Sequence, residues 1–276
     1  SCGLLGVFLI LRKMAMVGDA ISHAVLPGIV IAYLIADSRN SIIMLIGAAA
    51  FGLLTTFLIE WLYRRVRIPS DASIGITFTW LFAVGVILVS LYTGNVDLDQ
   101  ECVLYGDIAY IPFNLLWIGN QSLGPVYAWL QGGNLVLIVV GIIIGYRGLF
   151  ITSFDPAFAG ALGIGTGAWH YALMGAVSLT VVFSFNAVGA ILVVAFLVVP
   201  PATAYLLSKE LIKMLWLTAL FGILSAVGGF YLAVCWSASI TASMAVAAGI
   251  LFVIVFCSTK YKMRSSKHLS REVSIE

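Results

Sequence analysis

Apolar runs of near membrane-spanning length alternate with short polar segments along almost the whole chain. A helix needs about 20 mainly apolar residues to cross the hydrocarbon of a bilayer. We predict a short helix end over Leu4–Leu11 and spans over the following ranges: 14–36, 41–63, 74–92, 135–150, 169–185, 189–207, 214–234 and 237–257. The pattern therefore predicts an all-α, polytopic membrane helical bundle of about eight or nine transmembrane helices over residues 1–257.

The composition agrees with this fold class. Of the 276 residues, 62% are hydrophobic and only 9% are charged, and the mean hydropathy is +1.11. Soluble globular domains carry about 25% charged residues, so an ordinary soluble protein is excluded. The net charge of +2 indicates little by itself. We expect membrane lipid, and no nucleic acid, among the partners of this chain.

Polar segments separate the predicted spans. The longest, 93–134, combines acids with glycine and proline breakers, so we expect a surface loop with short interfacial helices. After the fifth span, Asp155 or Ser153 can cap a short helix that has Pro156 in its first turn and that ends at Gly163.

A third interruption falls inside a predicted span. Pro200 and Pro201 are expected to break the span over 189–207, because proline removes a helical hydrogen bond and clashes with the preceding turn. The chain then enters a polar segment that contains three charged residues: Lys209, Glu210 and Lys213.

Lysine and arginine residues predict the orientation, because basic residues are retained on the cytoplasmic side of short loops. Over alternate loops, 13 of the 14 basic residues fall on one face and only Arg39 falls on the other. The basic face is therefore expected to be cytoplasmic. It includes the segment around Asp155, the segment 200–213 and a basic tail over 258–276. The other face carries four acids of the long loop, which form either an outer docking surface or an ordinary solvated loop: Asp97, Asp99, Glu101 and Asp107.

The span over 14–36 carries two ionisable side chains, Asp19 and His23. They are four residues apart, so on a helix they lie on one face about one turn from each other. An ionisable group at membrane depth costs at least about 2.5 kcal/mol and normally faces a protein interior or a water-filled path. The pair is either part of a cation path or a buried pair that only fixes the packing of helices.

Pro27 extends the hypothesis of a cation path. If the helix continues through Pro27, the carbonyl of His23 loses its helical partner and becomes a third possible ligand. Carboxylate, imidazole and carbonyl suit manganese, zinc or ferrous iron without choosing among them. Metal binding needs a neutral imidazole and an ionised carboxylate, so low pH should weaken the site. Beside this face lies a row of small residues that would let another helix approach closely: Ala20, Ala24 and Gly28.

The chain lacks the motifs of several enzyme classes. There is no GxxxxGK[ST] phosphate loop, no HExxH and no GxSxG. These absences weaken the interpretation as an intramembrane protease or a lipase; the resemblance described below implies a transport subunit without enzymatic activity of its own. Glu60 is expected either to reach the lipid headgroups or to pair with Arg64, and His170 to lie at the interface without a partner. Cys102 and Cys235 fall near one predicted face, and we favour two unpaired thiols.

Three stretches resemble the permeases of metal-ion ABC importers, the zinc, manganese and iron family. The most specific is LRKMAMVGDAISHAVLPG over 11–28. The others are TSFDPAFA over 152–159, and GAILVV over 189–194 followed by VPPATA over 199–204. The outer segment LYGDIAY, 104–110, is more similar to the manganese-type branch than to the zinc-type branch.

The resemblance implies a type II importer-like permease that pairs with a second permease chain, identical or different. It also implies two cytoplasmic ATPase subunits and an extracytoplasmic metal-binding protein. Asp19 and His23 match the family's metal path. The segment from Pro200 to Lys213 matches elements that couple to the ATPase, and the segment at Asp155 and Pro156 matches a second inner contact.

We therefore expect a multi-pass protein of the bacterial cytoplasmic membrane that passes a divalent metal inward, with its C-terminus in the cytoplasm. Manganese is favoured, zinc and iron stay open, and no cofactor is permanently bound. One alternative is a secondary transporter driven by an ion gradient, which would work without an ATPase. Another is a membrane assembly protein without transport activity, which would tolerate the loss of Asp19.

Overall fold

The computed structural model describes residues 1–36, 41–92, 108, 115–118 and 121–272. The acids of the predicted outer face, Asp97, Asp99, Glu101 and Asp107, lie outside these residues, as does Cys102. Cys235 is exposed and forms no disulfide within the described part of the chain.

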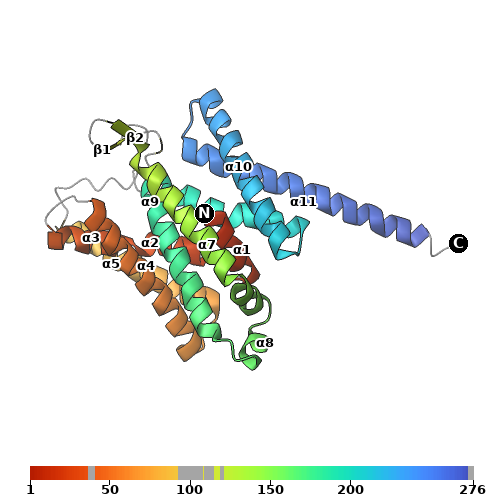
Figure 1. The fold of residues 1–276 in the computed structure, drawn as a ribbon, viewed down its shortest axis with the longest axis horizontal. Helices are drawn as coiled ribbons and strands as arrows, with labels where there is room; N and C mark the ends of the chain where they lie inside the picture. The colour runs from red at the N-terminus through yellow and green to blue at the C-terminus, as the bar shows by residue number, and fades with distance from the viewer. Residues whose placement is uncertain (37–40, 93–107, 109–114, 119–120, 273–276) are drawn as a thin grey trace.

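Helices make up nearly all of the described chain (Figure 1). Their bounds are α1 Cys2–Leu11, α2 Val17–Ala24, α3 Leu26–Ala36, α4 Ser41–Trp61, a π-helical turn η1 Leu62–Val66, α5 Ser70–Tyr92, α7 Val126–Phe154, α8 Pro156–Ala161, α9 Thr166–Leu207, α10 Leu211–Trp236 and α11 Ile240–Glu272. In the described ranges, eight helical segments are long and apolar enough to cross a membrane. The predicted all-α, polytopic bundle is confirmed.

The segment between the fourth and fifth spans differs from the prediction. In place of short interfacial helices, the described part holds an antiparallel pair of strands, β1 Leu115–Ile118 and β2 Gln121–Pro125. The dipeptide between them in the sequence, glycine followed by asparagine, is typical of hairpin turns. Helix α7 then begins at Val126, ahead of the predicted start at 135.

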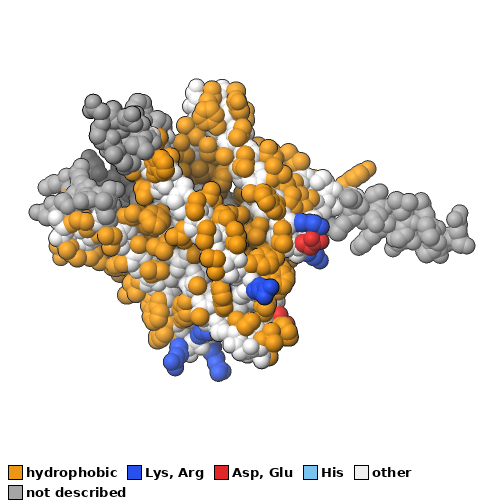
Figure 2. Space-filling model, in the orientation of Figure 1, with side chains coloured by type: hydrophobic (Ala, Val, Ile, Leu, Met, Phe, Trp, Pro, Cys, Tyr) orange, Lys and Arg blue, Asp and Glu red, His pale blue; other side chains and the backbone are white. Residues whose placement is uncertain are grey.

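The core of the bundle lies where α1, α2 and α9 meet. Helix α9 packs against α1, α2, α4, α7, α10 and α11. Among its fully buried side chains are Val177, Val181 and Leu197, which pack with Phe8 of α1 and Ile21 of α2. Most of the exposed large side chains are apolar, and Figure 2 shows Lys and Arg confined to the lower and right margins of the face that it presents.

Helix α9 consists of two spans joined at a single non-helical residue. Gly189 has φ 75° and ψ 167°, a conformation that is essentially restricted to glycine. The first half runs antiparallel to α1, since Cys2 contacts Ser184 and Arg12 contacts His170. The second half runs in the same sense as α1 and lies against Gly3 and Gly6. The predicted spans over 169–185 and 189–207 are these two halves.

The predicted break at Pro200 and Pro201 is wrong, because α9 continues through both prolines to Leu207. The two prolines leave the carbonyls of the residues four positions earlier, at 196 and 197, without helical donors. Both carbonyls lie against glycines of α1, the first against Gly3 and the second against Gly6. The closeness of α1 allows weak Cα–H···O contacts to take the place of the missing bonds.

We predict that Gly6→Ala destabilises the protein, because a methyl group at this position would overlap the carbonyl at 197 and the ring of Pro201. The expected loss is about 1–3 kcal/mol, as for other overpacked sites. The measurement is the unfolding midpoint of the purified protein in detergent micelles. Gly141→Ala is the matched control, since nothing lies within 4 Å of its added methyl group. Equal midpoints for the two variants would contradict the packing described here.

Candidate metal site

Asp19 and His23 are the two residues of α2 that are not buried, and we call them its open strip. The other six residues of this helix are buried: Val17, Gly18, Ala20, Ile21, Ser22 and Ala24. The side chains of Asp19 and His23 are 36% and 32% exposed, and His23 Nε2 lies 3.6 Å from Asp19 Oδ1. The predicted stacking on one face is confirmed. The two side chains point away from the buried core and toward the surface of this single chain.

Helix α2 is held in place by close contacts on its buried side. A methyl group at Gly18 would overlap the side chain of Leu197 in α9. Farther along, Gly28 of α3 lies against the carbonyl of Gly47 in α4, so the predicted row of small residues does permit a close approach. These contacts fix which side of α2 remains open.

Two phenylalanines of α5 flank the imidazole of His23. The ring centroids of Phe78 and Phe82 lie 5.5 and 5.7 Å from that of His23, and the two phenyl rings are 6.1 Å apart. Edge-to-face and tilted contacts at these distances are favourable. The phenyl rings cover one side of the imidazole and limit its rotation. Sequence reasoning missed this pair, although its spacing of four residues on an apolar helix is a visible signal.

The third ligand expected from Pro27 is not supported. Helix α2 ends at Ala24 and α3 begins at Leu26, so the helix does not continue regularly through Pro27. Pro27 lies instead in the first turn of α3, where a missing N–H group disrupts no bond. The amide of Val25 donates to the carbonyl of Ile21.

The pair brings together two side chains of metal-ligating type. Within the described ranges, no group of three or more His, Cys, Asp or Glu side chains is placed to hold a metal ion. Divalent metals take about four to six ligands. A metal held by Asp19 and His23 therefore needs further ligands from water, backbone carbonyls or another chain.

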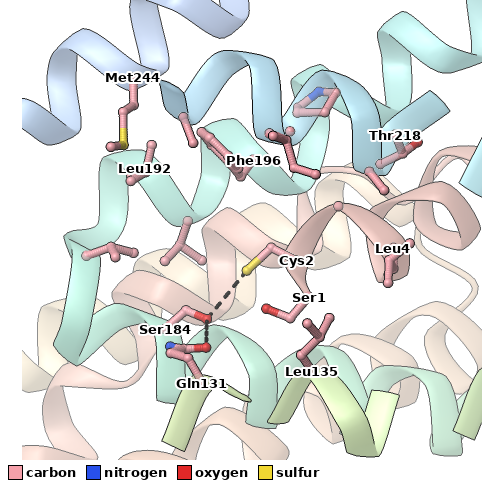
Figure 3. Close-up of a pocket in the computed structure, with 18 of the residues that line it drawn as sticks. Ser1, Cys2, Leu4, Gln131, Leu135, Ser184, Leu192, Phe196, Thr218 and Met244 are labelled. Atoms are coloured by element: carbon pink, nitrogen blue, oxygen red, sulfur yellow. Dashed lines mark hydrogen bonds between the residues drawn. The ribbon is translucent and has the colours of Figure 1, made fainter. Parts of the chain in front are cut away.

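A cavity of about 520 Å³ lies elsewhere, between α1, α7, α9 and α10 (Figure 3). Its polar groups form a short chain in which Cys2 Sγ lies 3.5 Å from Ser184 Oγ, and Ser184 Oγ lies 3.4 Å from Gln131 Oε1. Neither Asp19 nor His23 lines it, and its lining is predominantly apolar. The expected passage at the ionisable pair is therefore not this cavity.

The predicted inner contacts are partly exposed. Asp155 caps α8 by accepting a 2.9 Å hydrogen bond from the amide of Phe158, with Pro156 in the first position of the helix. Gly163 follows α8 with a φ of +74°. Both features agree with the sequence analysis. The exposed side chain of Phe158 lies on this short helix.

The segment from Pro200 to Lys213 has a buried part and an exposed part. Pro200 and Pro201 are buried within α9. The charged residues Lys209, Glu210 and Lys213 are exposed, and Lys213 Nζ lies 3.0 Å from Glu210 Oε1. The residues after α9 therefore offer charged side chains to a partner, and Tyr205 and Leu207 at the end of α9 are exposed as well.

Two other expectations about charged residues have different outcomes. Glu60 pairs with Arg64, which is one of its two expected arrangements. His170, which was expected to have no partner, lies against both Glu60 and Arg12. The sequence gives no sign of these contacts, because His170 is 158 positions from Arg12.

The comparison with known families agrees with the helical arrangement and with the motif around Asp19. The model of the ABC 3 transport family matches residues 1–259. The chain belongs to the ABC 3 transport family.

Family members of known name cover nearly the same length. The manganese transport system membrane protein MntD of Bacillus subtilis is 51% identical over 256 residues, which are 93% of this chain and 86% of that protein. The zinc transport system membrane protein TroD of Treponema pallidum is 39% identical over 93% of this chain and 70% of its own length. A solved structure, PsaBC from Streptococcus pneumoniae in complex with Fab, matches with a TM-score of 0.74 and 34% identity, covering 92% of this chain and 85% of that chain.

We predict that His23 and Phe78 are energetically coupled. In a double-mutant cycle with His23→Ala and Phe78→Ala, the coupling should be about 0.5–1 kcal/mol, as for other close aromatic pairs. The measurement is the unfolding free energy of the four proteins in micelles. Phe150→Ala provides the control cycle with His23→Ala, because the Phe150 ring contacts Tyr146 and Phe154 instead. A coupling near zero for the first cycle would contradict the ring packing.

Proposed function

We propose that this chain is the membrane permease of an ATP-driven importer of divalent metal, with manganese as its favoured substrate. The named relatives support this proposal, since those with manganese in their names include MntD at 51% identity. Zinc stays open because TroD is named for it, and iron stays open because carboxylate and imidazole ligands suit all three metals. No permanently bound cofactor is part of the proposal.

The observation that carries the proposal is the placement of Asp19 and His23. They are the two residues of α2 that are not buried, and both are metal-ligating types within a span that is otherwise apolar. An ionised carboxylate exposed to lipid would be costly. We therefore place the open strip of α2 on a passage formed with a second permease chain, identical or different, which completes the ligand set.

The remaining partners follow from the family and from the exposed segments. We assign two ATPase subunits to the basic face, because this chain has no phosphate loop of its own. Helix α8 with Asp155 and Pro156, and the exposed Lys209, Glu210 and Lys213, are the proposed contacts. An extracytoplasmic metal-binding protein would deliver the metal to the opposite face, where the acids of 97–107 are expected.

This assignment places the protein in the bacterial cytoplasmic membrane, with the basic face and the C-terminus in the cytoplasm. Metal would enter from the outer face, bind to Asp19 and His23, and leave on the cytoplasmic side when the ATPase subunits close. The carboxylate supplies charge and the neutral imidazole supplies a nitrogen ligand. Protonation of either group would release the metal.

We predict that Asp19→Asn and His23→Ala each lower metal uptake by at least about tenfold, because each removes a direct ligand. The measurement is uptake of labelled manganese by a transport-deficient cell that expresses the permease, the ATPase and the binding protein. Asp71→Asn is the matched control, since this acid is exposed in the first turn of α5, seven residues before Phe78. Uptake at the wild-type rate by Asp19→Asn would refute the proposed site.

The same assay separates the alternatives. A secondary transporter would import metal without the ATPase subunits, and a membrane assembly protein would support no uptake at all. Parallel measurements with zinc and iron rank the substrates.

A further inference from the structure

Four charged or titratable side chains meet at the basic end of the bundle, away from Asp19 and His23. Arg12 follows α1, Glu60 ends α4, Arg64 lies in η1, and His170 is near the start of α9. Glu60 is paired with Arg64, and its Oε2 atom lies 2.6 Å from His170 Nε2. The side chains of Glu60 and His170 are only 3% and 12% exposed. We call these four residues the basic-end cluster.

Arg12 connects the cluster to the end of α7. Its Nη1 atom lies 3.1 Å from His170 Nδ1. Its Nε donates to Ser153 Oγ at 3.0 Å, and its Nη2 donates to Thr152 Oγ1 at 2.9 Å. Thr152 and Ser153 are in the last turn of α7, directly before the cap of α8. One guanidinium group therefore joins α7, α9 and, through His170, α4.

The hydrogen bonds assign the protonation of His170. A guanidinium group only donates, so His170 Nδ1 must accept, and the ring proton is on Nε2, facing the Glu60 carboxylate. The imidazole therefore lies between the guanidinium group of Arg12 and the carboxylate of Glu60. Burial lowers the pKa of Arg12 from its ordinary value, while the Glu60 carboxylate acts in the opposite direction. The guanidinium still remains charged.

The basic-end cluster is not a second metal site. One oxygen of Glu60 is paired with Arg64, and the other faces His170. Two guanidinium groups beside one carboxylate leave a net positive charge, which repels a divalent cation. Replacing a whole buried ion pair by well-packed apolar residues is often neutral or stabilising, so the stability of the fold alone does not account for this cluster.

The position of Arg12 in the chain indicates what the cluster does. Helix α1 ends in a tight turn in which the amides of Lys13 and Met14 donate to the carbonyls of Ile10 and Leu9. Lys13 has a φ of 59° in this turn, and α2 begins at Val17. Arg12 is thus held rigidly to α1 and is separated from α2 by a short connection. A shift of Arg12 relative to the bundle would be passed to α2.

We propose that the basic-end cluster couples the α7–α8 junction to α2, so that movement of α8 changes the alignment of Asp19 and His23. Arg12, Thr152 and His170 are positioning residues in this scheme. The inference rests on the proposed function, because it takes α8 as a contact of the ATPase subunits. Its consequence is that the amount of metal imported per ATP falls when the cluster is broken.

Matched variants of Thr152 test the proposal. Thr152→Val keeps the shape of the side chain but removes the acceptor for Arg12, and Thr152→Ser keeps the hydroxyl group. Arg12→Lys is a second variant, since lysine keeps the charge but lacks the planar fork that reaches three partners. The assay uses the whole importer, with both ATPase subunits and the binding protein, in proteoliposomes.

Two quantities are measured for each variant: manganese binding without nucleotide, and manganese imported per ATP hydrolysed. We expect Thr152→Val and Arg12→Lys to bind manganese as the wild type does, while import per ATP falls at least about fivefold, the lower end of ordinary coupling between sites. Thr152→Ser should behave as the wild type.

The outcomes separate this inference from the proposed function. Wild-type import per ATP by Thr152→Val would overturn the coupling role and leave the metal site untouched. Loss of binding, hydrolysis and import together in Thr152→Val would also overturn it, because the cluster would then serve only folding. Absence of manganese binding in the wild-type complex would instead refute the proposed function. If Arg12→Lys fails to assemble, the pair of Thr152 variants still decides.

Discussion

A charge that leaves water must find a compensating partner, and this constraint accounts for the placement of the ionisable side chains in the bundle. Glu60 is buried and is paired with an arginine and an imidazole. Asp19 and His23 are placed differently, because in the described part of the chain each has the other as its ionisable partner and both remain partly exposed. The first arrangement is complete within the chain, whereas the second leaves ligand capacity free.

The helices that surround these charges approach closely because glycines are placed at the crossings. Gly3 and Gly6 let α1 lie against the part of α9 that contains two prolines, and Gly18 does the same for α2. The prolines would be unfavourable in an isolated helix. They are accommodated because the neighbouring helix covers the carbonyls that they leave without donors. Helix α9 can therefore remain continuous from Gly189 to Leu207.

Much of the fold was predictable from local patterns. Span positions follow from runs of apolar residues, and the cap of α8 follows from Asp155 and Pro156, since both signals are contained in a few adjacent residues. The stacking of Asp19 and His23 follows from helix geometry alone. The sequence could not reveal the continuity of α9 through Pro200, because that depends on glycines almost 200 positions earlier.

The contacts of His170 could not be predicted either, because they also join residues that are far apart in the sequence. Its partners Arg12 and Glu60 are on other helices, and no local pattern marks them. The flanking of His23 by Phe78 also depends on how α5 packs against α2. The sequence predicts that Asp19 and His23 lie on one face of a helix. Only the packing of the neighbouring helices shows that this face is exposed on the surface of a single chain.

The partial exposure of Asp19 and His23 also affects the stability of a copy that has not yet assembled with a partner. If Asp19 and His23 face a second permease chain, as we propose, a newly inserted copy without that chain presents a carboxylate and an imidazole to hydrocarbon, where each is poorly solvated. Such a copy is less stable than the finished complex, and cellular proteases remove chains that unfold. The pair on α2 would thus make the abundance of this subunit depend on the supply of its companion, so that unequal synthesis is corrected by turnover.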